Sequence, residues 1–373
     1  MADLAAATFA IRTESVTAGT NQKADTAWRR WNSYLESIGI QQDPFLDSFS
    51  VGQRLQVILA FAAAMRQARF SAGYSKLREG TVHSTIDNVA QIFRANDRKD
   101  PRLDSNNLRS FNLTRLWRAY RNTDGDIQHQ KAVPISLIRL ILNSAGSPFE
   151  YFKAHLVIVA FFFAMRSCEY TNISRGELHP EAERRTKLLC IRNFRFFQGT
   201  RMLDNFKDDL FQADSISITF EFQKNQERQE TVTQERSIDP DLCPVRSAAS
   251  IIMFIVRMPG VSADTSINSF RDNSGGTVLI SSAAVISTLR EAAATMGEDV
   301  LGFSPDEIGC HSIRSAFAMA LYLAGLGVAT IMLMGRWRSY SFLRYIRKQV
   351  QQFSSGISSR MIQREHFFTI PRL

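Results

Sequence analysis

The first third of the chain shows a helical spacing of apolar residues. Apolar side chains recur every three or four positions, as they do on the buried face of an amphipathic helix. The predicted helices cover residues 25–39, 51–70, 81–96 and 108–122. In the first of them, Asp25 is suited to cap the N-terminus and Gly39 to end the helix. Residues 1–23 have little periodicity, so we expect a loose arm there.

A polar stretch at 123–134 separates these helices from the rest of the chain. It contains Gly125 and ends in Pro134, and both residue types interrupt regular structure. The helices before it predict a compact all-α domain over 24–122. By itself, such a helical bundle indicates no function.

After this linker the pattern becomes a mixture of helices and short strands. A helix beginning at Pro134 and an apolar helix at 150–165 lead into β-rich sequence at 186–197. Residues 216–222 alternate strictly between apolar and polar side chains, which predicts a strand with one buried face. A polar turn at 223–229 and a second strand at 230–236 complete a predicted β-hairpin.

Helical periodicity resumes after the hairpin and continues almost to residue 350. The predicted helices cover residues 244–257, 281–296, 312–324, 327–334 and 339–350. We therefore predict a second domain over 135–350, followed by a tail at 351–373. The fold class expected for the whole chain is mainly α with a small antiparallel β-sheet.

Composition adds few limits to this description. The chain has 373 residues, of which 45% are hydrophobic and 22% charged, as is usual for a globular protein. A formal charge of +9 favours polyanionic partners without establishing one. The four cysteines are widely spaced, so no structural zinc site is indicated. The longest apolar run, at 156–165, is too short to cross a bilayer, and a secretory signal is not evident. We expect an intracellular protein that binds no membrane.

Candidate chemistry is concentrated in four short motifs of the second domain. The residues are Arg166, Glu169, Lys224, His311, Arg314, Trp337 and Tyr345. Taken singly, each has an ordinary structural explanation. An Arg after a buried helix caps its carbonyls, a Lys in a hairpin turn is solvated, and a Tyr at helical spacing belongs to a core.

The order of these residues resembles the catalytic pattern of the tyrosine recombinase, or phage-integrase, family. That pattern runs from an Arg with an acidic residue three positions later, through a hairpin Lys and a His-x-x-Arg box, to a Trp or His and a Tyr. The resemblance covers about residues 135–350, and the wording GRW…FLRYIR is most similar to eukaryotic mobile-element recombinases such as the cryptons. The N-terminal helices resemble the DNA-clamping core-binding domain in arrangement only.

The resemblance implies that Tyr345 attacks a DNA phosphodiester. Arg166 and Arg314 would hold the non-bridging oxygens, since guanidinium groups offer fork-like hydrogen bonds and stay charged. Their stabilisation grows as negative charge develops in the transition state. A tyrosine hydroxyl has an ordinary pKa of about 10, so the nucleophile needs help to lose its proton.

The remaining residues of the pattern would supply that help and protonate the leaving group. His311 would accept the tyrosine proton or contact the phosphate. Lys224 would donate a proton to the departing 5′-oxygen, and Trp337 would donate its indole N–H to the phosphate. Glu169 would orient these groups or balance their charge.

The implied product is a 3′-phosphotyrosyl link, which conserves the energy of the broken bond. The reaction therefore needs neither ATP nor metal, and the sequence contains no GxxxxGK[ST] loop or metal-binding acidic triad. The expected partner is double-stranded DNA, with no small-molecule cofactor. Recombination between two duplexes needs four active sites, so we expect a homotetramer, with the apolar tail 351–373 as a candidate contact to a neighbouring subunit. In a eukaryote the protein would act in the nucleus.

Several alternatives remain open at this point. Tyr340 is the rival nucleophile, and Lys207 competes weakly with Lys224. The protein could be a domesticated DNA-binding relative that no longer catalyses the reaction, although neither an Arg nor the Tyr of the pattern is lost. It could also be a type IB topoisomerase-like or telomere-resolving enzyme, although those chains are generally longer.

Overall fold

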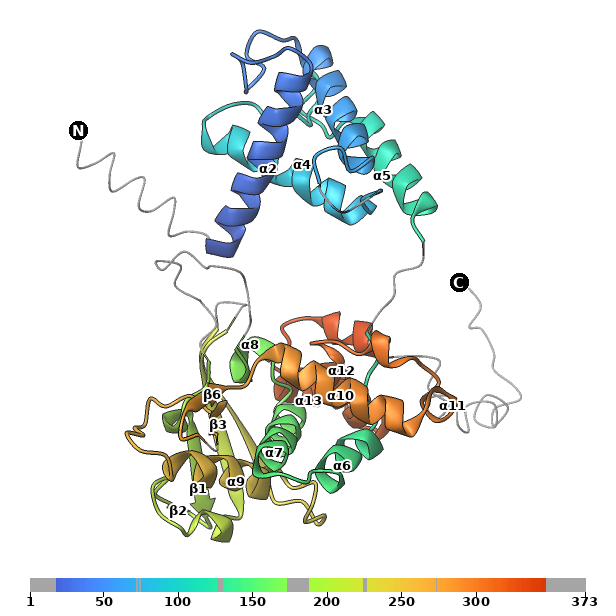
Figure 1. The fold of residues 1–373 in the computed structure, drawn as a ribbon. Coiled ribbons are helices and arrows are strands. Elements are labelled where there is room, and N and C mark those ends of the chain that lie inside the picture. Colours follow the sequence, from blue (N-terminus) through green and yellow to red (C-terminus); the bar gives the residue numbers. More distant parts are fainter. Residues whose placement is uncertain are drawn as a thin grey trace, which may run out of the picture. The chain divides into compact units, whose positions relative to one another are not determined.

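The chain divides into two units, one before and one after the polar stretch 123–134. The computed structural model describes residues 18–71, 73, 75–125, 130–172, 188–223, 227–272 and 274–346. The break between the units lies between Ile127 and Gln128, inside the polar stretch 123–134. The described part is mainly helical with a small antiparallel sheet, as predicted (Figure 1).

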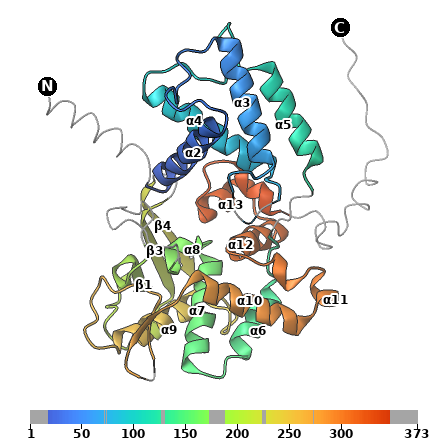
Figure 2. The same ribbon diagram turned by 45° about the horizontal axis from the view of Figure 1, so that its top comes forward.

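The first unit is built from helices around α4. They are α2 (Ala18–Ser37), α3 (Val51–Arg66), α4 (Glu79–Ala95) and α5 (Phe111–Thr123). Helix α4 packs against the other three, and Trp31, Phe61 and Phe93 are completely buried among them (Figure 2). Helix α2 begins at Ala18, so the prediction of a loose arm is wrong for residues 18–23. The first turns of α2 are polar and carry no apolar stripe that the sequence pattern could have revealed.

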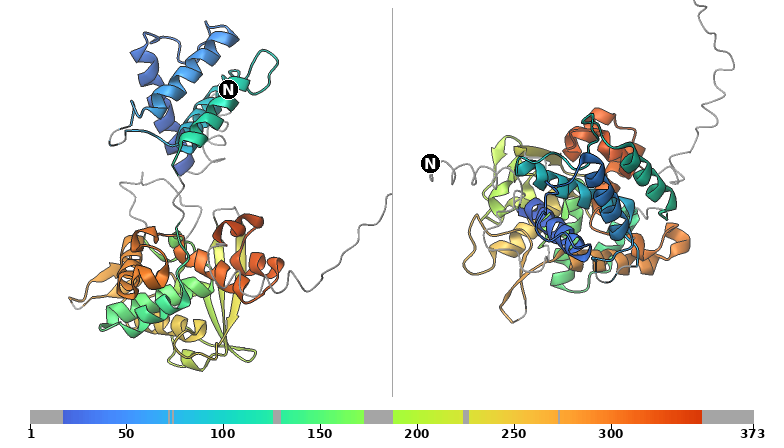
Figure 3. Two further views of the ribbon diagram at one scale, coloured as in Figure 1. Left: turned by 90° about the vertical axis from the view of Figure 1, so that its right-hand side faces the viewer. Right: turned by 90° about the horizontal axis from the view of Figure 1, so that it is seen from above.

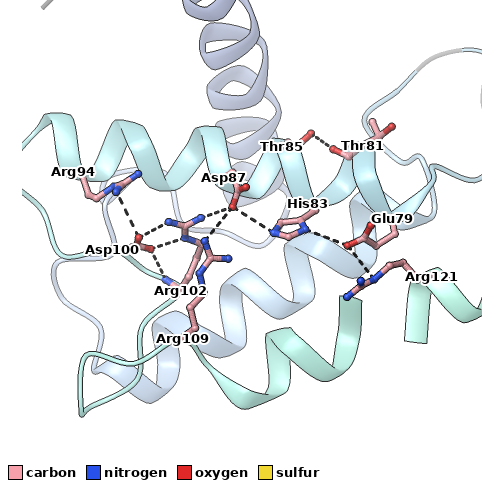
Figure 4. A network of polar contacts seen from close by, with 10 residues as sticks. All are labelled: Glu79, Thr81, His83, Thr85, Asp87, Arg94, Asp100, Arg102, Arg109 and Arg121. Atoms are coloured by element: carbon pink, nitrogen blue, oxygen red, sulfur yellow. Dashed lines mark hydrogen bonds and ion pairs between the residues drawn. The ribbon is translucent and has the colours of Figure 1, made fainter. Parts of the chain in front are cut away.

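A network of ion pairs attaches α4 to the loop that follows it. The buried Arg102 donates to Asp100 at 2.6 Å and also pairs with Asp87 of α4. His83 lies between Glu79 and Asp87, one helical turn away on either side (Figure 4). This network holds the loop in place, because removing one partner would leave buried charge unpaired.

The second unit combines helices with a small sheet, and α9 packs against the strands. Its helices are α6 (Ile135–Asn143), α7 (Pro148–Phe162), α8 (Ser167–Tyr170), α9 (Pro244–Val256), α10 (Ser282–Met296), α11 (Glu298–Leu301), α12 (Ser312–Leu323) and α13 (Val328–Gly335), with short 3-10 helices η1 (Ile191–Asn193), η2 (Leu210–Gln212), η3 (Pro305–Glu307) and η4 (Tyr340–Tyr345). Helix α7 is central and packs against α6, α9 and α12. The sheet and α11 lie on opposite sides of α7 (Figures 1 and 3). In the described part of the chain, no helix is both long and apolar enough to span a membrane.

The strands form a four-stranded antiparallel sheet and a separate short pair. The sheet has the order β2-β1-β3-β4, from β1 (Phe194–Gln198), β2 (Arg201–Met202), β3 (Ser215–Phe222) and β4 (Arg228–Glu235), and the pair is β5 (Ser269–Arg271) with β6 (Thr277–Leu279). The predicted hairpin and its alternation are confirmed, since Ile216, Ile218 and Phe220 are buried on one face. On the other face the hydroxyls of Thr219 and Thr231 lie 2.9 Å apart.

Two local predictions differ from the structure, and one pair of strands was not predicted. In the described part of the β-rich stretch 186–197, the strand begins only at Phe194, because Ile191–Asn193 form the 3-10 turn η1. The described part of the predicted helix 339–350 is the 3-10 helix η4. The pair β5–β6 was not predicted, since three-residue strands are too short to show alternation.

Candidate active site

The end of helix α7 forms the first side of the site. Ser147 and Glu150 form a capping box at its start, and the helix ends at Phe162. Ala164 then adopts a left-handed φ of 45°, and the next amide returns to the carbonyl of Ala160 at 2.9 Å. This is a Schellman turn, in which Gly is the usual residue at the left-handed position. The left-handed residue of this turn, Ala164, lies two residues before Arg166.

The end of helix α13 forms the second side and repeats the same turn. Arg336 has a φ of 56°, and the amide of Trp337 donates to the carbonyl of Met332 at 2.9 Å. The ring of Trp337 lies against Gly335, where a Cβ atom would come within 1.7 Å of its Cζ3. Glycine at 335 is therefore required by the packing of the Trp337 ring.

Arg166 is held by a carboxylate and an amide. Its Nη1 donates to Glu169 Oε1 at 2.9 Å and to Gln223 Oε1 at 3.0 Å. Its own backbone N–H donates to Glu169 Oε2 at 2.8 Å. The side chain of Arg166 nevertheless retains 18% of its exposure. Part of this guanidinium can therefore contact a ligand.

Arg314 connects the two helix ends from the first turn of α12. Its Nη2 donates to the carbonyl of Gly335 at 2.6 Å, and its Nη1 donates to the carbonyl of Ala164. Its guanidinium lies 4.6 Å from the ring centroid of Trp337, a cation–π distance. The structure thus brings together Arg166, Arg314, Trp337 and Glu169.

Two members of this cluster were missed by the sequence analysis, Arg336 and Gln223. Arg336 is completely buried and donates to both carboxylate oxygens of Glu169, at 2.9 and 3.1 Å. Gln223, at the end of β3, accepts from both Arg166 and Arg336. Both residues stand beside predicted ones, Trp337 and Lys224, but nothing in the local pattern indicates their burial.

The charges of the cluster are unbalanced in favour of the arginines. Burial alone would raise the pKa of Glu169, but the charge and hydrogen bonds of Arg336, with further contributions from Arg166 and Arg314, lower it to about 2. Glu169 is therefore ionised at neutral pH. Glu230, which accepts from Gln223, is the other carboxylate near Arg336, and burial raises its pKa. Three guanidinium groups against these two carboxylates leave excess positive charge, which favours an anionic ligand such as a phosphodiester.

His311 lies at the surface one helical turn before Arg314. It occupies the N-cap of α12, and its backbone N–H donates to Gln130 Oε1 at 2.8 Å. Gln130 approaches so closely that a Cβ atom at Gly309 would lie 2.1 Å from its Nε2. His311 itself is exposed.

The remaining predicted residues are only partly covered by the described structure. Lys224 lies outside the described residues, directly after Gln223. Tyr345 ends η4, and its side chain lies outside the described part. Its rival Tyr340 begins the same 3-10 helix and is 67% exposed. Lys207 lies in the loop between β2 and η2, not in the hairpin turn. Within the described ranges, no group of three or more His, Cys, Asp or Glu residues is placed to hold a metal ion.

Comparison with known proteins gives likenesses in structure only. No family model matches the sequence, and no curated protein matches it. A solved structure of the Tn1549 transposon integrase in complex with transposon right-end DNA is similar over 95% of this chain and 97% of that one, with a TM-score of 0.50 and 12% identity. The XerH recombinase bound to a palindromic difH substrate gives a TM-score of 0.48 at 12% identity, over 84% of this chain and 70% of that one. A lambda integrase tetramer bound to a Holliday junction gives a TM-score of 0.43 at 13% identity, over 86% and 76% of the two chains. At 12% identity, the likeness to the Tn1549 integrase concerns the fold alone.

Proposed function

We propose that this protein cuts and rejoins DNA by site-specific recombination through a 3′-phosphotyrosyl intermediate. The hydroxyl oxygen of Tyr345 attacks the phosphorus of one phosphodiester, and the 5′-oxygen of the adjoining nucleotide leaves. The new phosphotyrosyl bond conserves the energy of the broken one. A 5′-hydroxyl from another strand then reverses the step and reseals the DNA.

The observation that carries the proposal is the convergence of Arg166 and Arg314 at the ends of α7 and α13. Two guanidinium groups in one buried cluster, with a single carboxylate between them and Arg336, suit a pentacovalent phosphorane whose equatorial oxygens carry negative charge. The fold shared with the Tn1549 integrase, which was solved with transposon DNA, supports DNA as the substrate.

The proposed proton transfers use the other residues of the pattern. His311 accepts the proton of the tyrosine or assists its transfer, which suits its exposed position one turn from Arg314. Lys224 protonates the leaving 5′-oxygen. Trp337, held against Arg314, donates its indole N–H to the phosphate.

Covalent trapping on a nicked suicide DNA substrate tests the proposal. The wild-type protein is expected to form an adduct that resists denaturation, and Tyr345→Phe is expected to form none. Tyr340→Phe is the matched control, because Tyr340 lies on the same 3-10 helix. An adduct that persists in Tyr345→Phe and disappears in Tyr340→Phe would transfer the role to Tyr340. Tight binding of cognate DNA without any adduct would support the domesticated DNA-binding alternative, and relaxation of supercoiled DNA at unrelated sites would support the topoisomerase-like one.

The proposal extends to a homotetramer on two DNA duplexes. Exposed apolar side chains gather along the end of α12, α13 and η4, which suits a contact between subunits. They are Leu323, Leu326, Val328, Leu333, Tyr340 and Leu343. The tail 351–373, which lies outside the described residues, is the proposed occupant on the neighbouring subunit. Deletion of the tail is expected to abolish tetramers on DNA and to preserve binding to a single site, and unchanged tetramer formation would contradict it.

The biological setting is also part of the proposal. The GRW…FLRYIR motif, at Gly335 to Arg347, is most similar to the recombinases of crypton-type eukaryotic mobile elements. On this basis the protein acts on element ends in the nucleus, with the first unit clamping the DNA. Localisation of the tagged full chain in its host, together with sequencing of DNA junctions that depend on Tyr345, tests this setting.

A further inference from the structure

Arg336 is the most enclosed charge in the arginine cluster. Its guanidinium is completely buried and lies 3.4 Å from the ring centroid of Phe220. It donates to Glu169, to Gln223 Oε1 at 3.1 Å, and to the carbonyls of Phe163 and Ala164 at 3.2 and 3.1 Å. Its contacts therefore join the segment of α13 to the end of α7, to α8 and to the end of β3.

This arrangement has energetic costs that packing alone does not explain. Arg336 has a left-handed φ, and its Nε has no hydrogen-bond partner among the described residues. A non-glycine residue at positive φ and a buried unpaired N–H each destabilise the fold. Costs of this kind tend to persist where the surrounding site depends on the residue.

Arg336 determines how the charge of Glu169 is shared. The carboxylate accepts from Arg336 on both oxygens and from the side chain of Arg166 on Oε1 only. Without Arg336, Arg166 would be the remaining side-chain partner of a buried carboxylate. Arg166 is also the arginine of the cluster that keeps substantial exposure. Glu169 would then neutralise the charge of Arg166, which would no longer be available to bind a phosphate.

Gln223 is the second side chain that contacts both Arg166 and Arg336. Its Oε1 accepts from Arg166 and Arg336, and its Nε2 donates to Glu230 across the hairpin. An amide is the side chain that accepts from cations at one end and donates to a carboxylate at the other. Because it is neutral, Gln223 orients Arg166 without cancelling its charge.

We propose that Arg336 is a positioning residue that saturates Glu169 and so keeps the guanidinium of Arg166 available to the scissile phosphate. This inference rests on the proposed function and names a residue outside the predicted catalytic set. A lysine would preserve the charge of Arg336 but could not reach Glu169, Gln223 and two carbonyls at once. Arg336→Lys is therefore expected to resemble Arg336→Met in its effect on cleavage.

A pair of DNA substrates distinguishes this role from a merely structural one. The first has the natural phosphodiester at the cleavage point, and the second has a neutral methylphosphonate, whose missing charge reduces the need for Arg166. On the phosphodiester, Arg336→Met is expected to lower the rate of adduct formation about 100-fold relative to wild type, as loss of a preorganised donor does. On the methylphosphonate the same ratio is expected to be near one.

The control variant is judged by the same two quantities, the ratio of its rate to the wild-type rate on each substrate. Arg139, on α6, pairs with Asp239 of the loop between β4 and α9. Arg139→Met removes this pair and is expected to leave both rates close to wild type. Equal losses for Arg336→Met on both substrates would mean a structural role and would overturn the inference. An undiminished rate on the phosphodiester would overturn it as well.

A crystal structure of full-length Arg336→Met gives a readout independent of cleavage. Arg166 is expected to turn onto Glu169 with two side-chain hydrogen bonds and to leave Gln223. If Arg166 keeps its contacts with both Glu169 and Gln223, the inference is wrong. A wild-type protein that forms no adduct would contradict the proposed function, and this crystal structure would still decide the role of Arg336.

Discussion

Ala164 and Arg336 both have left-handed backbones, and the side chain of Arg336 donates to the carbonyl of Ala164 at 3.1 Å. Each residue terminates a helix that leads directly into the site, Ala164 after α7 and Arg336 after α13. The same carbonyl of Ala164 also accepts from Arg314. The two helix ends are therefore joined through one peptide oxygen. This junction fixes the positions of Arg166 and Trp337, which follow Ala164 and Arg336 in the sequence.

Replacing Ala164 by glycine tests whether the first of these turns is strained. Glycine adopts the left-handed conformation without the steric cost that a Cβ atom imposes. Ala164→Gly is expected to increase the free energy of unfolding by about 1 kcal/mol, measured by urea titration. The matched control is Ala160→Gly in the last turns of α7, which should lower stability by about 1 kcal/mol. A decrease for both variants would show that the turn at Ala164 carries no relievable strain.

Replacing Gly335 by alanine tests how the packing of the Trp337 ring against residue 335 contributes to the site. The added Cβ would collide with the indole, which would have to move from its place beside Arg314. We expect a loss of about 1–3 kcal/mol in stability, as in other overpacked sites. On the proposed function, adduct formation should fall by a larger factor than DNA binding. Gly327→Ala, at the start of α13 with open space around its Cβ position, is the control. Equal behaviour of the two variants would contradict the prediction.

The local patterns of the sequence were sufficient for the main elements and for recognising the motifs around Arg166 and Arg314. The alternation from Ile216 to Phe220 and the apolar stripe of α4 are properties of neighbouring residues, so periodicity revealed them. The motifs around Arg166 and Arg314 were recognisable for the same reason, although the proximity of the two arginines was an implication of the resemblance.

Other features depend on contacts between distant segments and could not be read from the sequence. Arg336 is buried because Phe163, Glu169 and Gln223, from three different segments, enclose it. A sequence window around Arg336 shows an arginine next to a tryptophan and gives no sign of this enclosure. The polar start of α2 is helical although no apolar stripe marks it.

Glu169 and Arg336 form a buried ion pair whose two halves can be removed separately. Glu169→Gln leaves Arg336 buried without its carboxylate, which is expected to cost about 3–5 kcal/mol in the free energy of unfolding. The double variant Glu169→Gln with Arg336→Met removes both charges and should be less destabilised than the sum of the two single variants. Urea unfolding of the four proteins measures the coupling. Strict additivity would mean that the pair contributes no interaction energy.

His155 predicts a dependence of stability on pH in the second unit. It lies on α7, within 3.3 Å of the Ser247 hydroxyl, and burial together with the charge of Arg246 lowers its pKa from 6.5 to about 4. Between these values the unfolded chain binds a proton that the folded protein does not, so stability rises with pH in this range and is lost as pH falls from 6.5 towards 4. The loss attributable to His155 is at most about 3 kcal/mol.

The variant His155→Gln isolates this contribution, because glutamine keeps a hydrogen-bonding group beside Ser247 and does not titrate. Urea unfolding at several pH values between 4 and 7 measures the free energy of unfolding of both proteins. As pH falls through this range, the wild type should lose stability more steeply than the variant. Above pH 7 the two proteins should differ only by a constant. Carboxylates elsewhere in the chain also titrate near the lower end of this range, but they are common to both proteins and cancel in the difference. If the two proteins lost stability equally between pH 7 and pH 4, the folded protein would bind a proton at His155 as readily as the unfolded chain does. The prediction would then be wrong.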